Sequence, residues 1–298
     1  MTEPPRTASD PPLAPGLYLV ATPIGNLEDI TLRALRVLRT ADRIACEDTR
    51  QTRKLLDRYG ITAPAISSHE HNEADRSRQL IEELKSGARI AVVSDAGTPG
   101  ISDPGMILAR TAIAAGVAVY PIPGPSAALA ALVASGLDTE SFLFAGFPPS
   151  KAGARRTALE GLADSLAQPT TVVLYEAPHR IAETLADVES IFGAECSVVL
   201  ARELTKIHEE FLRGTVAEVR QTLAGRDSIR GEMVLLVAAR PRAADANRAA
   251  GSIVERLAEF ARAEGLAEKD ALKRIARERG VSKSELWREL QRERARGR

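Results

Sequence analysis

Aromatic residues are scarce in this 298-residue chain, at 4% of the total, so its core must be built mainly from Ala, Val, Leu and Ile. Only two cysteines occur, Cys46 and Cys196, and they are far apart and lack metal-ligand spacing. They favour reduced, buried thiols in a cytoplasmic protein. No apolar run reaches the ~18 residues of a membrane span. Residues 1–15 carry five prolines and no apolar segment of the signal-peptide type, so we expect a disordered tail there.

Several well-known catalytic motifs are also missing. No GxGxxG follows the first predicted strand, and there is no Walker A sequence, no GxSxG elbow and no HExxH. The sequence therefore lacks the usual motifs of nicotinamide-dependent enzymes, nucleotide hydrolases and α/β-hydrolases. His69 and His71 alternate around Glu70 without an evident third ligand, so we expect no metal site.

The formal net charge is zero, but it is unevenly spread. Residues 241–298 hold 15 Lys and Arg against 10 Asp and Glu, a surplus of five. A basic tail on a slightly acidic body suggests a nucleic-acid partner. A solvated helical surface would give the same bias, so charge alone does not decide.

Apolar, β-branched segments alternate with helical patterns from residue 17 onward, which predicts an α/β fold. In the first part we expect strands at 17–21, 43–46, 90–93 and 117–121, and helices at 31–40, 49–59, 72–85, 105–115 and 126–135. These βαβ units predict a largely parallel sheet. A Gly-Leu-Asp break at 136–138 marks the first boundary, giving a domain at 16–136.

A second α/β domain is expected at 137–240. Its predicted strands are 141–145, 170–175, 196–201, 209–213 and 233–237, and its predicted helices are 155–167, 179–191 and 216–223. Residues 148–156 read as a flexible basic loop. An Ala/Arg-rich linker then leads to three short helices at 252–298, with Ser252 capping the first and a Ser282–Glu285 capping box starting the last. This helix-turn-helix-like domain could bind nucleic acid or simply pack.

The sequence SDAGTPGISDPG at 94–105 is the most informative segment. It follows a predicted buried strand and contains three glycines and two prolines, which exclude helix and strand. Ordinary βα turns need only two to six residues. Ligands of open α/β sheets sit at the carboxyl ends of strands, so we expect this loop to bind one.

Several motifs in order resemble one family. They are VATPIGNLED at 20–29, CEDTR at 46–50, the 94–105 loop, PGPSA at 123–127, YEAPHR at 175–180, LTK at 204–206 followed by HE at 208–209, and GEMV at 231–234. The chain resembles the ribosomal RNA small subunit methyltransferase I family, a branch of the tetrapyrrole methylase superfamily, over about residues 16–237.

This resemblance implies two α/β domains of the tetrapyrrole methylase type plus a small C-terminal helical domain. It implies a homodimer that binds S-adenosylmethionine (AdoMet) between the α/β domains and 2'-O-methylates a cytidine in the 16S rRNA decoding centre, within assembled small subunits. By analogy with the superfamily, the cofactor-binding residues are expected to be Pro23, Asp95, Gly97, Thr98, Ser126, Ala127, Tyr175, Ala201 and Met233.

RNA-specific roles are expected on motifs that small-molecule methylases lack. Lys206 could lower the pKa of the acceptor hydroxyl, and Glu209 or Asp48 could accept its proton. Expected RNA contacts are Arg50, Lys151, Arg155, Arg156 and Arg180.

Two alternatives remain open from the sequence. One keeps the fold and changes the substrate, as in a corrin-precursor or diphthamide methylase. The other is a non-catalytic RNA-binding assembly factor. Small-molecule methylases have no evident need of a basic helical tail, which favours RNA.

Overall fold

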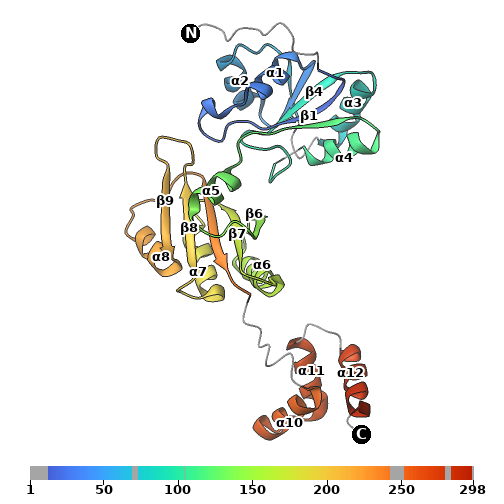
Figure 1. Ribbon diagram of the computed structural model, residues 1–298, viewed down its shortest axis with the longest axis vertical. Coiled ribbons are helices and arrows are strands. Elements are labelled where there is room, and N and C mark those ends of the chain that lie inside the picture. Colours follow the sequence, from blue (N-terminus) through green and yellow to red (C-terminus); the bar gives the residue numbers. More distant parts are fainter. Residues whose placement is uncertain (1–12, 69–72, 104, 242–251, 279–282, 297–298) are drawn as a thin grey trace. The chain divides into compact units, whose positions relative to one another are not determined.

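The computed structural model describes residues 13–68, 73–103, 105–241, 252–278 and 283–296 (Figure 1). The chain divides into two compact units. The larger unit runs to Ala163 and from Pro169 to Ala239, and the smaller comprises Asp164–Gln168 and the part after Ala239. The sequence-based boundaries at 15, 136, 240 and 252 stay predictions beside this division.

The larger unit begins with a five-stranded parallel sheet of order β3-β2-β4-β1-β5, as the βαβ pattern predicted. Its strands are β1 Gly16–Val20, β2 Arg43–Cys46, β3 Ala65–Ser67, β4 Arg89–Val93 and β5 Val119–Ile122. Its helical elements are η1 Leu27–Asp29, α1 Leu32–Thr40, α2 Thr49–Arg58, α3 Glu73–Lys85 and α4 Met106–Ala114. The short strand β3 was not expected from the sequence.

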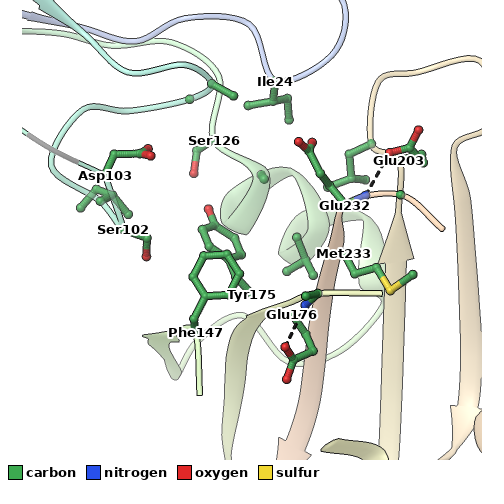
Figure 2. A pocket seen from close by; sticks show the side chains of 18 of the residues that line it. Ile24, Ser102, Asp103, Ser126, Phe147, Tyr175, Glu176, Glu203, Glu232 and Met233 are labelled. Carbon is green, nitrogen blue, oxygen red and sulfur yellow. Dashed lines mark hydrogen bonds between the residues drawn. The ribbon is translucent and has the colours of Figure 1, made fainter. Parts of the chain in front are cut away.

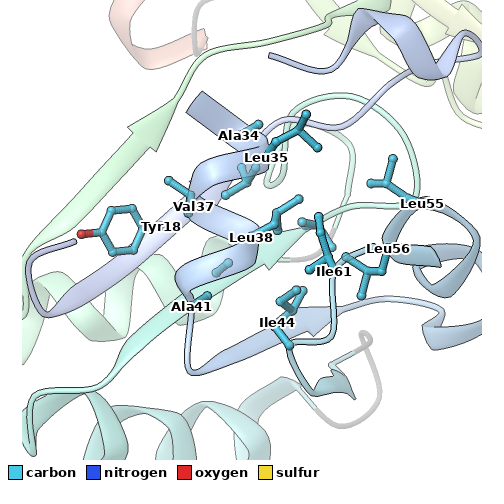
Figure 3. Close-up of a cluster of buried hydrophobic side chains, with 14 of the residues drawn as sticks. Tyr18, Ala34, Leu35, Val37, Leu38, Ala41, Ile44, Leu55, Leu56 and Ile61 are labelled. Atoms are coloured by element: carbon cyan, nitrogen blue, oxygen red, sulfur yellow. The ribbon is translucent and has the colours of Figure 1, made fainter. Parts of the chain in front are cut away.

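Helices cover both faces of this sheet, so its strands are apolar on both sides. Leu35 and Leu38 of α1 and Leu56 of α2 join one buried cluster (Figure 3), while Leu80 of α3 and Leu108 of α4 join another. Both clusters consist mainly of Ala, Val, Leu and Ile. The expectation drawn from the scarcity of aromatics is confirmed.

A second sheet of order β6-β7-β10-β8-β9 follows in the same unit. Its strands are β6 Phe142–Gly146, β7 Thr170–Glu176, β8 Ser197–Arg202, β9 Glu210–Thr215 and β10 Met233–Ala239. Only β6 and β7 pair in parallel, and the other three pairings are antiparallel. Its helices are α5 Ala127–Ser135, α6 Ala152–Ser165, α7 Ile181–Phe192 and α8 Val216–Ala224.

The smaller unit contains α10 Ile253–Glu264, α11 Glu268–Glu278 and α12 Lys283–Arg296. As predicted, the Ser252 side chain caps α10 by accepting from the Glu255 amide, and Gly265 ends that helix in the left-handed conformation. Leu257, Phe260, Leu272 and Leu290 contribute to its separate core. The predicted capping box at Ser282 lies outside the described residues.

One residue of α12 stands apart from this core. Trp287, the only tryptophan of the chain, lies on α12 with 45% of its surface exposed. Among the described helices of both units, none is long and apolar enough to cross a bilayer.

Two sequence expectations are wrong. Residues 152–156 are not loop, because α6 begins at Ala152, and Arg155 on its first turn is buried. Cys196 is only partly buried, whereas Cys46 is buried as expected, and neither of these cysteines forms a disulfide.

Candidate functional site

The loops that follow β1 and β4 are tied together at the carboxyl edge of the parallel sheet. The Thr22 amide donates to the Gly97 carbonyl (2.9 Å) and the Gly97 amide donates to the Thr22 carbonyl (3.0 Å). The Thr22 hydroxyl also donates to the Ser94 carbonyl at 3.1 Å. Gly97 has φ +83°, a left-handed conformation that a side chain would strain. The glycine-rich loop is therefore fixed before any ligand binds.

The β1 loop also contacts the second sheet. The Asn26 amide donates to the Thr205 hydroxyl at 3.0 Å. A Cβ placed on Gly25 would lie 2.6 Å from the Lys206 Cγ and 2.9 Å from the Leu204 carbonyl. Gly25 is therefore required by this close backbone approach, which joins the two halves of the larger unit.

A cavity of about 640 Å³ opens between these segments (Figure 2). Its volume falls in the usual range of small-molecule sites. Its wall contains residues from the loops after β1 and β4, from the start of α5, and from the second sheet and its loops, namely Ile24, Ala96, Gly97, Thr98, Ile101, Ser102, Asp103, Ser126, Ala127, Phe147, Tyr175, Glu176, Ala177, Pro178, Glu203, Leu204, Lys206, Gly231, Glu232, Met233 and Val234.

Tyr175 and the first turn of α5 form the middle of this wall (Figure 2). Ser126 is the N-cap of α5, and its side chain accepts from the Leu129 amide. The pKa of the Tyr175 phenol is raised, mainly by burial, and the backbone of Ala128 acts in the opposite direction. The Tyr175 ring packs edge-to-face against Phe147, with ring centroids 5.5 Å apart. The wall thus offers an aromatic surface beside a helix N-terminus, where amides favour an anionic group.

Glu176, below Tyr175, is buried but fully partnered. Its carboxylate forms an ion pair with Arg180, accepts from the Thr184 hydroxyl at 2.5 Å and accepts from the Ala177 amide at 2.8 Å. A buried charge needs such partners to avoid a large desolvation cost. Glu176 and Arg180 therefore hold the end of β7 in place.

Lys206 is the only cation among the described lining residues. Its ammonium donates to Glu203 (2.8 Å) and Glu232 (3.1 Å). Burial acts to lower the pKa of Lys206, but the hydrogen bonds to the two carboxylates outweigh it and raise that pKa. The bond to Lys206 in turn lowers the pKa of Glu203. Both groups stay charged at neutral pH.

The backbone is strained around this cluster. Glu203 and Thr205 have φ +53° and +65°, and Ser102, in the loop after β4, has φ +60°. These are the only described non-glycine residues with positive φ, and such strain concentrates at functional sites.

Asp103 is half-buried in the same wall. Burial raises its pKa to about 6, and the negative charges of Glu47 and Asp95 act in the same direction, against a hydrogen bond from Ser94. Asp103 in turn contributes to a raised pKa at Tyr175, after burial, which is the main cause.

The structure brings together part of the predicted cofactor set. Gly97, Thr98, Ser126, Ala127, Tyr175 and Met233 line the cavity. Pro23, Asp95 and Ala201 are not among the lining residues: Pro23 lies buried before Ile24, Asp95 accepts from the Asp48 amide at 3.2 Å, and Ala201 is buried in β8. Whether these nine residues bind the cofactor stays a prediction.

Of the three predicted catalytic residues, only Lys206 lines the cavity. Glu209 accepts from the Thr205 amide at 2.7 Å and so stabilises the strained loop. Asp48 caps α2 and binds Arg50, and that hydrogen bond lowers the pKa of Asp48 to about 2.

The predicted RNA-binding cations differ in their exposure and in their partners. Arg50 is exposed beside Asp48, and Lys151 is exposed before α6. Arg155 is buried against Asp187 (2.6 Å) and Glu183, Arg156 binds Asp187 at 2.7 Å, and Arg180 pairs with Glu176. Arg155 and Arg180 thus have structural partners that sequence reasoning did not anticipate.

Sequence reasoning also missed four carboxylates of the wall, Asp103, Glu176, Glu203 and Glu232. Asp103, Glu176 and Glu232 stood inside motifs already singled out, so their acidity was the available signal. Among the described residues, no group of His, Cys, Asp and Glu is arranged to hold a metal ion.

The sequence of this chain matches one family profile and several named proteins. The sequence profile described as Tetrapyrrole (Corrin/Porphyrin) Methylases matches residues 16–220. The chain is 52% identical over 226 residues to "Ribosomal RNA small subunit methyltransferase I" of Mesorhizobium japonicum, covering 76% of each protein. It is 47% identical over 274 residues to the protein of the same name from Halalkalibacterium halodurans, covering 91% of this chain and 93% of that one.

Solved structures share the fold at lower identity. The crystal structure of the methyltransferase CobJ matches with a TM-score of 0.57 at 19% identity, over 77% of this chain and 95% of that one. A diphthine synthase structure matches with a TM-score of 0.55 at 16% identity, over 75% and 89%. These likenesses establish the two-sheet architecture and no more.

Proposed function

The chain belongs to the tetrapyrrole (corrin/porphyrin) methylase family, in its ribosomal RNA small subunit methyltransferase I branch, and from this we propose that it is an AdoMet-dependent 2'-O-methyltransferase acting on a cytidine in the decoding centre of 16S rRNA. The single observation that best supports an rRNA substrate is the match to the Halalkalibacterium halodurans protein, which extends into the smaller unit. The residues of the cavity support AdoMet as the cofactor.

The residues present fit AdoMet. The cavity of about 640 Å³ combines an aromatic and aliphatic wall of Tyr175, Ile24 and Met233 with the helix N-terminus at Ser126. An adenosyl group needs the first and an amino-acid carboxylate is favoured by the second. Pro23, Asp95, Gly97, Thr98, Ala127 and Ala201 complete the proposed cofactor set.

AdoMet supplies an activated methyl group on a sulfonium, so the chain's own residues have to orient the acceptor, exclude water and remove one proton. The Thr22–Gly97 bridge holds the glycine-rich loop, which limits the ordering entropy lost on binding. Lys206 places a positive charge in the wall, where it stabilises a developing oxyanion.

The RNA and the oligomer are also part of this proposal. Arg50, Lys151 and Arg156 are exposed cations available to phosphates. A homodimer is supported by the exposed apolar side chains of α4 and α5, Met106, Ile107, Ile113, Leu129 and Val133. A cytoplasmic location follows from the proposed rRNA substrate. Analytical ultracentrifugation tests the dimer, and a monomer at micromolar concentration contradicts it.

Mass mapping of rRNA nucleosides tests the function. Small subunits prepared without this protein are incubated with the protein and AdoMet, then digested and analysed. We expect one 2'-O-methylcytidine per 16S rRNA, and none on large subunits. Methylation of a base, or no RNA methylation at all, contradicts the proposal.

A further inference from the structure

Methyl transfer to a hydroxyl group requires a base that takes up the hydroxyl proton. The structure reduces the number of carboxylates that could be this base. Asp48 is tied to Arg50, with a pKa of about 2, so it is a weak base. Glu209 holds the Thr205 amide and is not in the cavity wall. Glu203 and Glu232 are both bound to the Lys206 ammonium. Each of these carboxylates already has a defined partner other than a substrate.

Asp103 differs from them in its surroundings. It lines the cavity, in the loop between β4 and α4, directly after the strained Ser102. Figure 2 shows its carboxyl group directed toward the side of the pocket that carries Ser126 and Tyr175. The groups that act on it are the carboxylates of Glu47 after β2 and Asp95 after β4 and the Ser94 hydroxyl, and Asp103 itself acts on Tyr175 of β7.

We infer that Asp103 is the catalytic base, taking the proton from the acceptor hydroxyl during methyl transfer; this inference rests on the proposed function. In that step the acceptor oxygen forms a bond to the methyl carbon while the carbon–sulfur bond breaks, and its electron pair stays on sulfur. The hydroxyl proton passes to the Asp103 carboxylate, which later releases it to water. No metal or further reactant enters the balance.

The environment of Asp103 suits this role. Burial and the neighbouring charges of Glu47 and Asp95 bring its pKa to about 6, closer to neutrality than an ordinary aspartate. A carboxylate in this range is mostly ionised at pH 7.5 and is a stronger base, which is the compromise that general-base catalysis favours. The same neighbours raise the free energy of the ionised carboxylate, so the ionised Asp103 lowers the stability of the folded protein.

The first experiment compares Asp103→Asn with wild type and with Asp227→Asn, which changes an exposed aspartate outside the cavity. Calorimetry should give AdoMet affinities within about threefold for all three. Single-turnover transfer to small subunits should fall at least ~100-fold only for Asp103→Asn, the usual effect of losing a general base.

Two further readouts, the titration of the carboxyl group and the melting temperature, do not depend on activity. The ¹³C signal of the Asp103 carboxyl, assigned by its loss in Asp103→Asn, should titrate near pH 6. Glu47→Gln removes one negative neighbour, so this midpoint and the midpoint of the pH–rate profile should both move to lower pH. Asp103→Asn should raise the melting temperature at pH 8 but not at pH 4, since the ionised carboxylate is destabilising only above its pKa.

The outcomes separate the two proposals. Wild-type protein that leaves small subunits unmethylated overturns the proposed function. Active wild type with an equally active Asp103→Asn variant overturns only the role of Asp103, as does a carboxyl midpoint near pH 4.

Discussion

At the scale of single residues, the cavity sets the charge of each acid through its partners. Lys206 lowers the pKa of Glu203 and keeps it ionised, whereas the buried Glu176 is bound by Arg180 and Thr184. Asp103 lacks a cationic partner among the groups that shift its pKa. Carboxyl groups that line the same cavity therefore differ in how readily they take up a proton.

A residue-scale prediction concerns the pH dependence of stability. Hydrogen bonds from Arg226, with a smaller contribution from Arg202, lower the pKa of Glu210 to about 2. Because the folded pKa is depressed, the stabilisation is present above about pH 4.5 and is lost as the pH falls toward 2. Glu210→Gln should cost about 1–2 kcal/mol at pH 7, a value discounted because the side chain is 28% exposed.

Urea unfolding at pH 7 and pH 2.5 measures this effect. The difference between wild type and Glu210→Gln should be much smaller at the lower pH, which approaches the folded pKa of Glu210, and the exposed-site control Glu195→Gln should match wild type at both. An equally large difference at pH 2.5 would assign the effect to packing.

A second residue-scale prediction tests the cavity as the cofactor site. Ser126→Trp places an indole in the wall at the start of α5, so AdoMet affinity should fall at least tenfold in calorimetry. Ser228→Trp makes the same change at an exposed position outside the wall and should bind AdoMet normally. Equal affinities in the two variants would exclude this cavity.

At the scale of elements, the contact between the β1 loop and residues 204–206 joins the two sheets. Gly25→Ala would bring a Cβ within 2.9 Å of the Leu204 carbonyl, and backbone there has to move. We expect a loss of about 1–3 kcal/mol in stability, the usual cost of overpacking. AdoMet affinity should also decrease, because Ile24 and Lys206 both line the cavity.

The matched control is Gly153→Ala on α6, where a Cβ meets nothing within 4 Å. That variant should gain about 0.5–1 kcal/mol, since alanine favours helix. Thermal unfolding and calorimetry of both variants check the pair. A neutral Gly25→Ala would show that the loop can move without cost.

Most elements could be predicted because their signals are local. Thr31 caps α1 and Ser252 caps α10, and both positions stand out in the sequence. β3 has only three residues and no clear period, so it was missed. The start of α6 was missed because Arg155 reads as a loop cation until Asp187, 32 residues later, is known to face it.

At the scale of the whole molecule, the order of motifs predicted the family, and the glycine-rich loop predicted the place of the cavity. The state of Asp103 could not be predicted in the same way. It depends on Glu47, Asp95 and burial beside Tyr175, which come from distant parts of the chain. The sequence therefore favoured Asp48 and Glu209 as proton acceptors, although each is hydrogen-bonded to a residue close to it in the chain.

The whole-molecule prediction concerns the smaller unit. Truncation after Ala239 leaves both sheets complete, so AdoMet affinity in calorimetry should not change. Binding to small subunits should weaken and its salt dependence should flatten, because residues 241–298 carry a surplus of five positive charges. An unchanged affinity and salt slope would leave the three helices with a packing role.

The distribution of fluorophores makes the two units optically separable. Trp287 belongs to the smaller unit, whereas all four tyrosines, Tyr18, Tyr59, Tyr120 and Tyr175, belong to the larger one. Indole emission excited beyond the tyrosine band therefore reports only α12 and its surroundings. Phenol emission reports largely the α/β unit. An unlabelled protein can thus reveal which unit melts first, and which one responds when RNA is added.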